Sequence, residues 1–253
     1  MTTAIPIPDR FRSIQGAAPL ALEVAEIVDL APGFRRLRLT GSDLRDFEFQ
    51  AGQDLMVMVA ANGDRTTSRR YTIRGFDRTQ LLLDLDMVVH HGEGPGLRWA
   101  QGLQPGDKLN AVGPRGKIYL DPDADWHLFA GDESAVAATL IMMEAAASST
   151  PCLALLEIEG PDYEVPVPFG EDPRRRLIWL QRGKDASLAD SVAALDLPPG
   201  TGHAYINGEV GLVSAVRRVL ENRGLAPEQI SPKAYWGRGQ GNEVNGEPEK
   251  RPT

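Results

Sequence analysis

The chain has 253 residues, 42% of them hydrophobic, with a formal net charge of −8 and a pI near 5.1. This length and apolar content suit a soluble globular enzyme with one large or two moderate domains, and the acidic balance argues against a nucleic-acid-binding protein. The single cysteine, Cys152, excludes an internal disulfide framework and an iron–sulfur cluster held only by the chain's own cysteines. No stretch offers the ~20 apolar residues of a membrane span, and no export signal is visible, so a cytoplasmic protein is expected.

The first half of the chain is predicted to be β-rich, although residues 1–17 show no clear element. Residues 20–39 alternate apolar and polar side chains around a Pro32–Gly33 turn signal, as a β-hairpin does. Residues 55–60 and 81–89 continue the β character. Many short strands separated by Gly, Pro and Asp predict an antiparallel β-barrel.

The most informative stretch of this half is residues 69–74, Arg-Arg-Tyr-Thr-Ile-Arg. On a strand, successive side chains alternate between two faces, so Arg69, Tyr71 and Ile73 share one face. Tyr71 can lie against a flat ring, Arg69 or Arg74 can bind a phosphate, and Thr72 can hydrogen-bond a polar ring edge. A flat ring joined to a pyrophosphate describes a flavin dinucleotide. Taken alone, so short a motif is more typical of an ordinary strand with exposed arginines.

A glycine-rich loop at residues 90–96 follows the next predicted strand and precedes a short apolar segment that could open a helix. Glycines permit close backbone approach to a phosphate, and a helix N-terminus favours an anion; by itself, the loop could equally be a flexible connection. Metal ligation by the paired histidines, His90 and His91, is not expected. Neighbours on a strand point to opposite faces, and only His127 and His203 remain elsewhere.

The second half alternates predicted strands with predicted helices. Strands are expected at residues 153–158, 177–180, 203–206 and 233–236, and helices at 135–147, 187–195 and 212–223. This alternation predicts a doubly wound parallel sheet, in which ligands bind at the carboxyl ends of the strands. The loops expected at that edge are 131–134, 181–184, 208–209 and 237–239.

Seven spaced motifs, between about residues 20 and 236, resemble those of the siderophore-interacting proteins, which are FAD-dependent ferric-siderophore reductases related to the ferredoxin reductase superfamily. The matching pieces are Arg69-x-Tyr71-Thr72-x-Arg74, His91-Gly92-x-Gly94-Pro95-x-x-x-Trp99-Ala100, Gly113-Pro114-Arg115-Gly116, Gly131-Asp132-Glu133-Ser134, Trp179-Leu180-x-Arg182, Gly208-Glu209 and Tyr235-Trp236.

The resemblance implies an FAD-binding barrel at residues 18–122 and an NAD(P)H-binding α/β domain at 123–239. Residues 240–253 are nearly devoid of apolar side chains and are expected to form a flexible tail. The tail could instead cover the active-site mouth. In the barrel, Arg69 would contact the FAD pyrophosphate, Tyr71 and Thr72 the isoalloxazine, and the 92–95 loop the phosphates. The implied cofactor-binding residues are Arg69, Tyr71, Thr72, Ile73, Arg74, His91, Gly92, Gly94, Pro95 and Trp99 in the barrel, and Gly131, Asp132, Glu133, Ser134, Arg182, Gly208, Glu209 and Trp236 in the second domain.

The implied reaction passes a hydride from NADH or NADPH to FAD and then single electrons to ferric iron in a siderophore, so no catalytic side chain and no resident metal are expected. Two alternatives stay open: a general flavin-based reductase with another acceptor, and a siderophore- or flavin-binding protein without turnover. No membrane or nucleic-acid partner is expected, and a monomer is the default.

Two departures from the family pattern bear on the substrate. Where many relatives carry a lysine, the chain has Leu-Met-Val-Met at residues 55–58, and the terminal motif reads Tyr-Trp-Gly-Arg at 235–238. A reduced or displaced positive charge would suit a less anionic substrate, with Lys117, Lys233 and Arg238 as candidate substrate-binding residues. Arg182 and Lys184 follow a strand, where a basic side chain could meet a 2′-phosphate, which gives NADPH a preference over NADH.

Overall fold

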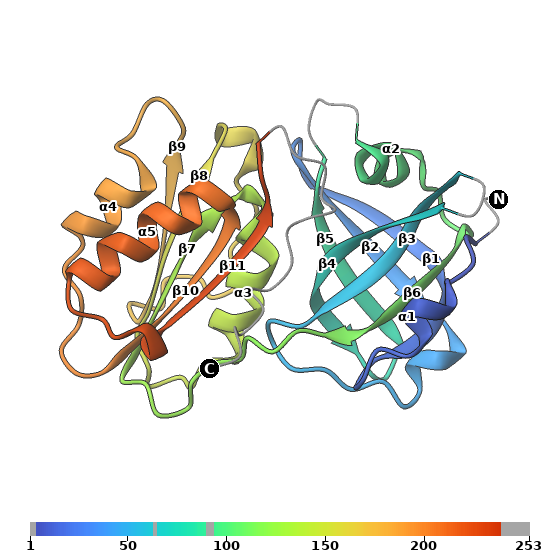
Figure 1. Ribbon diagram of the computed structural model, residues 1–253, viewed down its shortest axis with the longest axis horizontal. Helices are drawn as coiled ribbons and strands as arrows, with labels where there is room; N and C mark the ends of the chain where they lie inside the picture. The colour runs from blue at the N-terminus through green and yellow to red at the C-terminus, as the bar shows by residue number, and fades with distance from the viewer. Residues whose placement is uncertain (1–3, 63–64, 90–93, 239–253) are drawn as a thin grey trace. The chain divides into compact units, whose positions relative to one another are not determined.

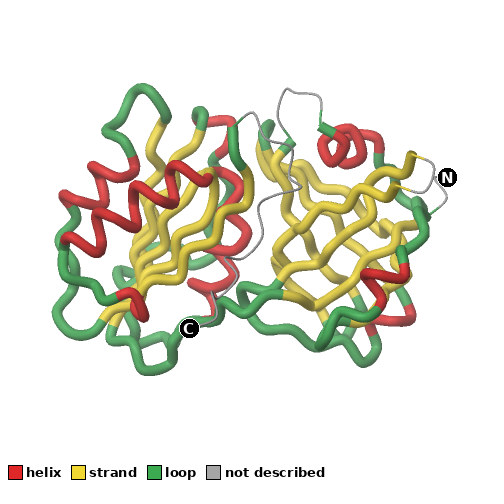
Figure 2. The backbone as a smooth tube through the Cα atoms, in the orientation of Figure 1, coloured by secondary structure: helices red, strands yellow, loops and turns green. Residues whose placement is uncertain are grey.

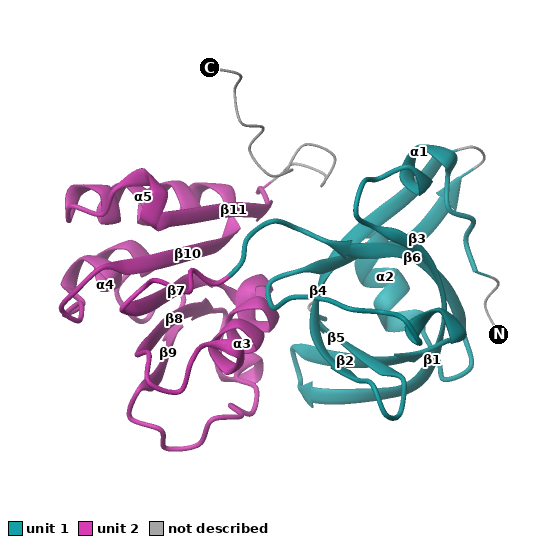
Figure 3. Ribbon diagram, turned by 90° about the horizontal axis from the view of Figure 1, so that it is seen from below, with its two compact units in different colours: residues 1–119 teal, residues 120–253 magenta. Residues whose placement is uncertain are grey.

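The computed structural model describes residues 4–62, 65–89 and 94–238. The chain divides into two compact units, residues 1–119 and residues 120–253, coloured separately in Figure 3.

Unit 1 is a closed six-stranded barrel with the strand order β1-β2-β5-β4-β3-β6, and every neighbouring pair is antiparallel. Figure 1 shows these strands winding around one core. Because alternate side chains of each strand point inward, Leu22, Leu37, Leu55 and Leu85 meet in the interior. The strands are β1 (Ala18–Ala31), β2 (Phe34–Thr40), β3 (Asp54–Asn62), β4 (Arg65–Asp77), β5 (Leu82–Val88) and β6 (Lys108–Arg115).

The predicted hairpin is confirmed, because Ala31 of β1 pairs with Phe34 of β2 across Pro32 and Gly33. The strands expected at residues 55–60 and 81–89 are also present, as β3 and β5. The barrel was therefore predictable from local alternation and turn residues.

In the described part of unit 1, three helical segments accompany the barrel. The N-terminal segment, for which the sequence indicated no element, contains the short helix α1 (Asp9–Arg12), and the apolar side chains around it pack on Met56, Met58 and Val112. A 3₁₀ turn, η1 (Ser42–Leu44), follows β2, and the helix α2 (Pro95–Gly102) lies between β5 and β6. Proline suits the first position of α2, where no intrahelical N–H bond is lost.

Unit 2 is a five-stranded parallel sheet with the order β11-β10-β7-β8-β9. The helices α4 and α5 cover one face and α3 covers the other, as the tube in Figure 2 and the ribbon in Figure 3 show. The doubly wound architecture is thus confirmed. The elements are β7 (Trp126–Asp132), η2 (Glu133–Ala135), α3 (Val136–Ala145), β8 (Cys152–Ile158), η3 (Pro161–Tyr163), β9 (Arg175–Gln181), α4 (Leu188–Ala194), β10 (Gly202–Glu209), α5 (Val210–Asn222), η4 (Pro227–Gln229) and β11 (Ile230–Trp236).

The strand order of unit 2 reverses between β7 and β10. In an open α/β sheet, the crevice beside such a reversal, at the carboxyl ends of the strands, is where ligands bind. The ends of β7 and β10 carry the predicted residues Asp132 and Glu209. The fold therefore places these two residues at the expected ligand edge.

Candidate functional site

Two of the predicted flavin residues, Arg69 and Tyr71, lie against the start of α2. The rings of Tyr71 and Trp99 stack with their centroids 5.8 Å apart and an angle of 22° between their planes. A Cβ atom added to Gly96 would lie 2.9 Å from Arg69 Cγ and 3.2 Å from Tyr71 Oη, so glycine is what allows this close approach. A helix N-terminus and an arginine side by side form a favourable place for a phosphate.

The other residues of the 69–74 strand motif pair with acidic side chains of the barrel or are buried in it. Arg70 forms a two-pronged ion pair with Asp54, at 3.0 Å from Nε and 2.8 Å from Nη2. Arg74 is 9% exposed, and its Nε lies 3.7 Å from a carboxylate oxygen of Asp86. Arg69 is therefore better placed than Arg74 to meet a phosphate. Two further predicted residues, Thr72 and Ile73, are buried.

The glycine-loop residues are only partly described. His91 and Gly92 lie outside the described residues. Gly94 is the N-cap of α2, and Pro95 is the first residue of that helix. Lys117, a predicted substrate contact, is exposed just after β6.

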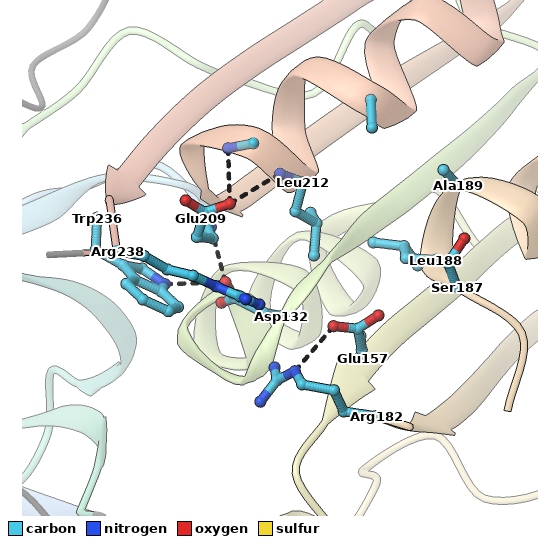
Figure 4. Close-up of a pocket in the computed structure, with 12 residues that line it drawn as sticks. Asp132, Glu157, Arg182, Ser187, Leu188, Ala189, Glu209, Leu212, Trp236 and Arg238 are labelled. Atoms are coloured by element: carbon cyan, nitrogen blue, oxygen red, sulfur yellow. Dashed lines mark hydrogen bonds and ion pairs between the residues drawn. The ribbon is translucent and has the colours of Figure 1, made fainter. Parts of the chain in front are cut away.

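Unit 2 contains a cavity of about 260 Å³ at the carboxyl edge of its sheet. Figure 4 shows side chains from the ends of strands, or just after them, and from the starts of α4 and α5 converging on it. A cavity of this size accommodates part of a dinucleotide rather than the whole of it. The lining residues are Asp132, Glu157, Arg182, Ser187, Leu188, Ala189, Glu209, Gly211, Leu212, Ala215, Trp236 and Arg238.

Asp132, at the end of β7, is fully buried and holds neighbouring segments together. Its Oδ1 accepts hydrogen bonds from the backbone N–H and the hydroxyl of Ser134, and its Oδ2 accepts from the backbone N–H of Glu209 at 2.7 Å and from Trp236 Nε1 at 2.9 Å. Burial raises the pKa of the carboxyl group, while these donors oppose the shift. Asp132 thus links the ends of β7, β10 and β11 where they line the pocket.

Two glycines make this arrangement possible. A Cβ atom on Gly131 would lie 2.3 Å from the carbonyl oxygen of Asn207, and one on Gly208 would lie 2.6 Å from Asp132 Oδ2. Gly208 also has a φ of +134°, which L side chains rarely adopt. The ends of β7 and β10 can lie so close together only because both positions are glycine.

Glu209 caps α5. Its Oε2 accepts hydrogen bonds from the backbone N–H groups of Gly211 at 2.7 Å and Leu212 at 3.0 Å. These are first-turn donors of the helix, which would otherwise face an incoming anion. The carboxylate of Glu209 therefore already compensates the positive end of α5.

Arg182, just after β9, is bound by two carboxylates. Its Nη2 lies 2.7 Å from Glu133 Oε2, and its Nε lies 3.0 Å from Glu157 Oε1. Burial lowers the pKa of the guanidinium, but the hydrogen bonds and charges of the two glutamates outweigh burial, so the pKa is raised and the positive charge is retained. We call this group the Glu133–Arg182–Glu157 triad.

The two remaining predicted substrate residues lie on or just after β11. Arg238 is exposed and lines the cavity beside Trp236 (Figure 4). Lys233 is only 5% exposed, with its Nζ 5.6 Å from the centre of the Tyr235 ring.

The structure brings together Asp132, Glu209, Arg182, Trp236 and Arg238 around one pocket. Sequence reasoning missed Glu157, the single charged residue in the otherwise apolar strand β8. An acidic residue next to last in a strand of a parallel sheet was the available signal. The other lining residues that were missed are Ser187, Leu188, Ala189, Gly211, Leu212 and Ala215.

Within the described residues, no group of three or more His, Cys, Asp and Glu side chains is arranged to hold a metal ion. No helix in that part of the chain has both the length and the apolar character needed to cross a membrane.

Two family models match the chain. A model described as the siderophore-interacting FAD-binding domain matches residues 53–118, and one described as siderophore-interacting protein matches residues 124–239. A curated relative, the ferric vibriobactin reductase ViuB of Vibrio cholerae, is 31% identical over 257 residues, covering 91% of this chain and 94% of that protein. The chain belongs to the siderophore-interacting protein family.

Two further comparisons agree with this membership. The NADPH-dependent ferric-chelate reductase of Escherichia coli is 25% identical over 240 residues, covering 85% of this chain and 91% of that protein. The crystal structure of the siderophore-interacting protein SipS from Aeromonas hydrophila superposes with a TM-score of 0.75 at 27% identity, covering 87% of this chain and 98% of that one. The family relationship therefore extends across both units.

Proposed function

We propose that this protein is an NAD(P)H-dependent flavoenzyme that reduces ferric siderophores and so releases ferrous iron. In this proposal residues 18–122 bind FAD and residues 123–239 bind the nicotinamide dinucleotide. The proposal draws on ferric reductases among the relatives, on the match to the FAD-binding model and on the pocket of unit 2. The observation that carries it is the close approach of Arg69 and Tyr71 to the first turn of α2, within the region that matches the FAD-binding model.

The residues of unit 1 fit FAD. A Cβ atom at Gly96 would obstruct Arg69 and Tyr71, so this glycine keeps a phosphate-binding arginine and a helix N-terminus side by side. Arg69 would bind the pyrophosphate, and Tyr71, supported by Trp99, would offer an aromatic face to the ring system. Burial raises the pKa of Tyr71, which keeps the phenol neutral and able to donate a hydrogen bond.

The pocket of unit 2 fits part of a nicotinamide dinucleotide. It lies at the carboxyl edge of the parallel sheet, beside the β7–β10 reversal, and has polar groups around an apolar wall from α4 and α5. Asp132 would hold the turn at residues 131–134 in place, and Arg238 would offer a positive charge to the pyrophosphate. The aliphatic side chains of Leu188 and Leu212 would exclude water from the bound nucleotide.

FAD, when bound, accepts a hydride from the nicotinamide and passes electrons on singly, so the protein need supply no general base. The work left to the side chains is binding, orientation and electrostatics. Ferric iron in a siderophore becomes labile on reduction because hard oxygen donors hold the smaller, more highly charged ferric ion more firmly.

A second candidate is a general flavin reductase with another acceptor. The observation that favours it is on β3, where residues 55–58 are all buried, Leu55 and Val57 inside the barrel and Met56 and Met58 beneath the N-terminal segment. This strand therefore offers no basic side chain to an anionic ferric chelate. A siderophore of low negative charge would reconcile this feature with the leading proposal.

The test is a steady-state assay of the purified full-length protein with FAD, a nicotinamide dinucleotide, one ferric siderophore at a time and a ferrous-specific chromogenic chelator. The proposal expects ferrous release that requires both FAD and protein. An Arg69→Ala variant should need a higher FAD concentration, while an Arg65→Ala variant on an exposed part of the same strand should behave like the original protein. Flavin reduction without ferrous release from any chelate would instead support the general reductase.

A further inference from the structure

The positive charge of Arg182 in the unit 2 pocket is already neutralised. In the Glu133–Arg182–Glu157 triad, one guanidinium binds two carboxylates, at 2.7 and 3.0 Å, so the triad has a net charge of −1. The side chains of Glu133 and Glu157 are only 14% and 15% exposed. Ion pairs shielded to this degree are screened less than those on an open surface.

The loop after β9 adds no excess of positive charge. Lys184 Nζ donates to Gln181 Oε1 at 2.9 Å, and the carboxylate of Asp185 accepts from the backbone N–H of Gln181 at 2.6 Å. Further along, Ser187 donates its hydroxyl to Asp190 at 2.7 Å. Around this corner of the pocket, the cations Arg182 and Lys184 are therefore outnumbered by carboxylates.

Glu157 stands where an acidic residue can recognise a ribose. It is next to last in β8, which pairs with β7, and the end of β7 carries the 131–134 turn. In dinucleotide-binding sheets, an acidic side chain at the end of the strand beside the turn accepts a hydrogen bond from the ribose 2′-hydroxyl, whereas a nearby arginine accommodates a 2′-phosphate. Glu157 lines the pocket (Figure 4). Its Oε1 accepts the hydrogen bond from Arg182 Nε, and its Oε2 takes no part in that bond.

We propose that the Glu133–Arg182–Glu157 triad makes NADH, rather than NADPH, the electron donor of this protein. Glu157 accepts a hydrogen bond from the 2′-hydroxyl of the adenosine ribose, and the two glutamates keep Arg182 from binding a 2′-phosphate. The inference rests on the proposed function and differs from the NADPH preference that Arg182 and Lys184 suggest in the sequence.

The physical reason is electrostatic. A phosphate monoester carries about −1.5 to −2 charges near neutral pH, so a 2′-phosphate would meet a triad of the same sign. Three of the five N–H donors of Arg182 already bind the two glutamates, so the phosphate would meet a group of net negative charge unless a glutamate moved away. A glutamate that moved away would become a poorly hydrated, unpaired carboxylate. A ribose hydroxyl is uncharged and can be bound while both glutamates stay paired with Arg182.

The test uses the full-length protein and two ligands that differ only in the phosphate, ADP-ribose and 2′-phospho-ADP-ribose, with affinities measured by isothermal titration calorimetry. We expect ADP-ribose to bind at least about tenfold more tightly, because the 2′-phosphate brings like charges together at the binding site. Flavin reduction should show the same preference for NADH over NADPH.

Three variants complete the test. Replacing both glutamates, Glu133→Gln with Glu157→Gln, frees Arg182 and should shift the affinity ratio at least about tenfold toward the 2′-phosphorylated ligand. The single Glu157→Gln change should shift it in the same direction and serves if the double variant does not fold. Glu221→Gln is the matched control, because this carboxylate also pairs with an arginine, Arg217 at 2.8 Å, but outside the pocket.

The outcomes separate the two proposals. Equal or tighter binding of 2′-phospho-ADP-ribose by the unaltered protein, or an unchanged ratio in the glutamate variants, overturns the inference and leaves the proposed function standing. Failure to bind either ligand, together with no flavin reduction by NADH or NADPH, overturns both.

Discussion

Trp236 donates its indole N–H to Asp132 across the end of β10, with Nε1 and Oδ2 2.9 Å apart. This bond joins the ends of β11 and β7, which are not neighbours in the sheet. The same carboxylate oxygen accepts a hydrogen bond from the backbone N–H of Glu209, the last residue of β10, which lies between β11 and β7. One buried carboxylate thus fixes three strand ends at the proposed dinucleotide site.

An Asp132→Asn substitution should therefore be strongly destabilising. The asparagine amide keeps the shape of the carboxylate, but its NH₂ group is a donor where an acceptor oxygen stood, and it would face other N–H groups. We therefore expect the free energy of unfolding, measured by urea denaturation, to fall by about 2–4 kcal/mol. Trp236→Phe removes only one of the bonds and should cost about 1 kcal/mol. Equal stability of Asp132→Asn and the unaltered protein would contradict the claim that the Asp132 carboxylate fixes the three strand ends.

Gly96→Ala should weaken FAD binding more than it affects folding. The new methyl group would lie 2.9 Å from Arg69 Cγ, so Arg69 must move away from the start of α2. We expect about a tenfold weaker FAD affinity, or about 1.4 kcal/mol, in a titration followed by flavin fluorescence. Gly102→Ala, at the other end of the same helix, is the control because its Cβ atom meets nothing within 4 Å. Identical FAD affinities in the two variants would argue against the role given to Arg69.

His127 should make the protein less stable as the pH falls below about 6.5. Burial lowers the pKa of this imidazole in the folded state, so the unfolded chain takes up a proton first. The stability associated with the neutral ring is complete above the unfolded pKa, near 6.5, and is lost as the pH falls toward the folded pKa. Urea denaturation of the original protein and of His127→Phe, compared between pH 7.5 and 5.5, measures this contribution. The phenylalanine variant should lose less stability over that interval, and parallel pH profiles would refute the assignment.

Cys152 should be inert in the folded protein. It is fully buried, its thiol donates to the carbonyl oxygen of Thr150 at 3.7 Å, and burial raises its pKa to about 11. At pH 8, only about 0.1% would be thiolate, the form that reacts with alkylating agents. Mass spectrometry should find no iodoacetamide adduct under native conditions and complete labelling in urea. Rapid native labelling would show that β8 opens readily.

Local sequence patterns were sufficient to predict much of the fold. The Ala31–Phe34 hairpin follows from alternation around a proline–glycine turn, and the second unit follows from its alternating strand and helix periods. The motif residues that line the unit 2 pocket stand at or just after strand ends and next to a glycine. These features depend on neighbours in the chain.

The partners of the charged residues could not be predicted in the same way. Arg182 reads as a possible phosphate ligand, but its partners Glu133 and Glu157 are 49 and 25 positions away along the chain. Lys233, whose charge by itself is more typical of a solvated surface, is instead buried beside Tyr235. Such pairings depend on how the sheet assembles, which a local pattern does not specify.

The central claim is tested most directly by an anaerobic experiment on the FAD-loaded protein, followed through the flavin absorbance. NADH is added first, and a ferric siderophore is added once the spectrum is stable. The account predicts that the flavin bleaches and then recovers its colour, with two ferrous ions released for each flavin reoxidised. A flavin that NADH and NADPH both fail to bleach, or a bleached flavin that no ferric siderophore reoxidises, would contradict it.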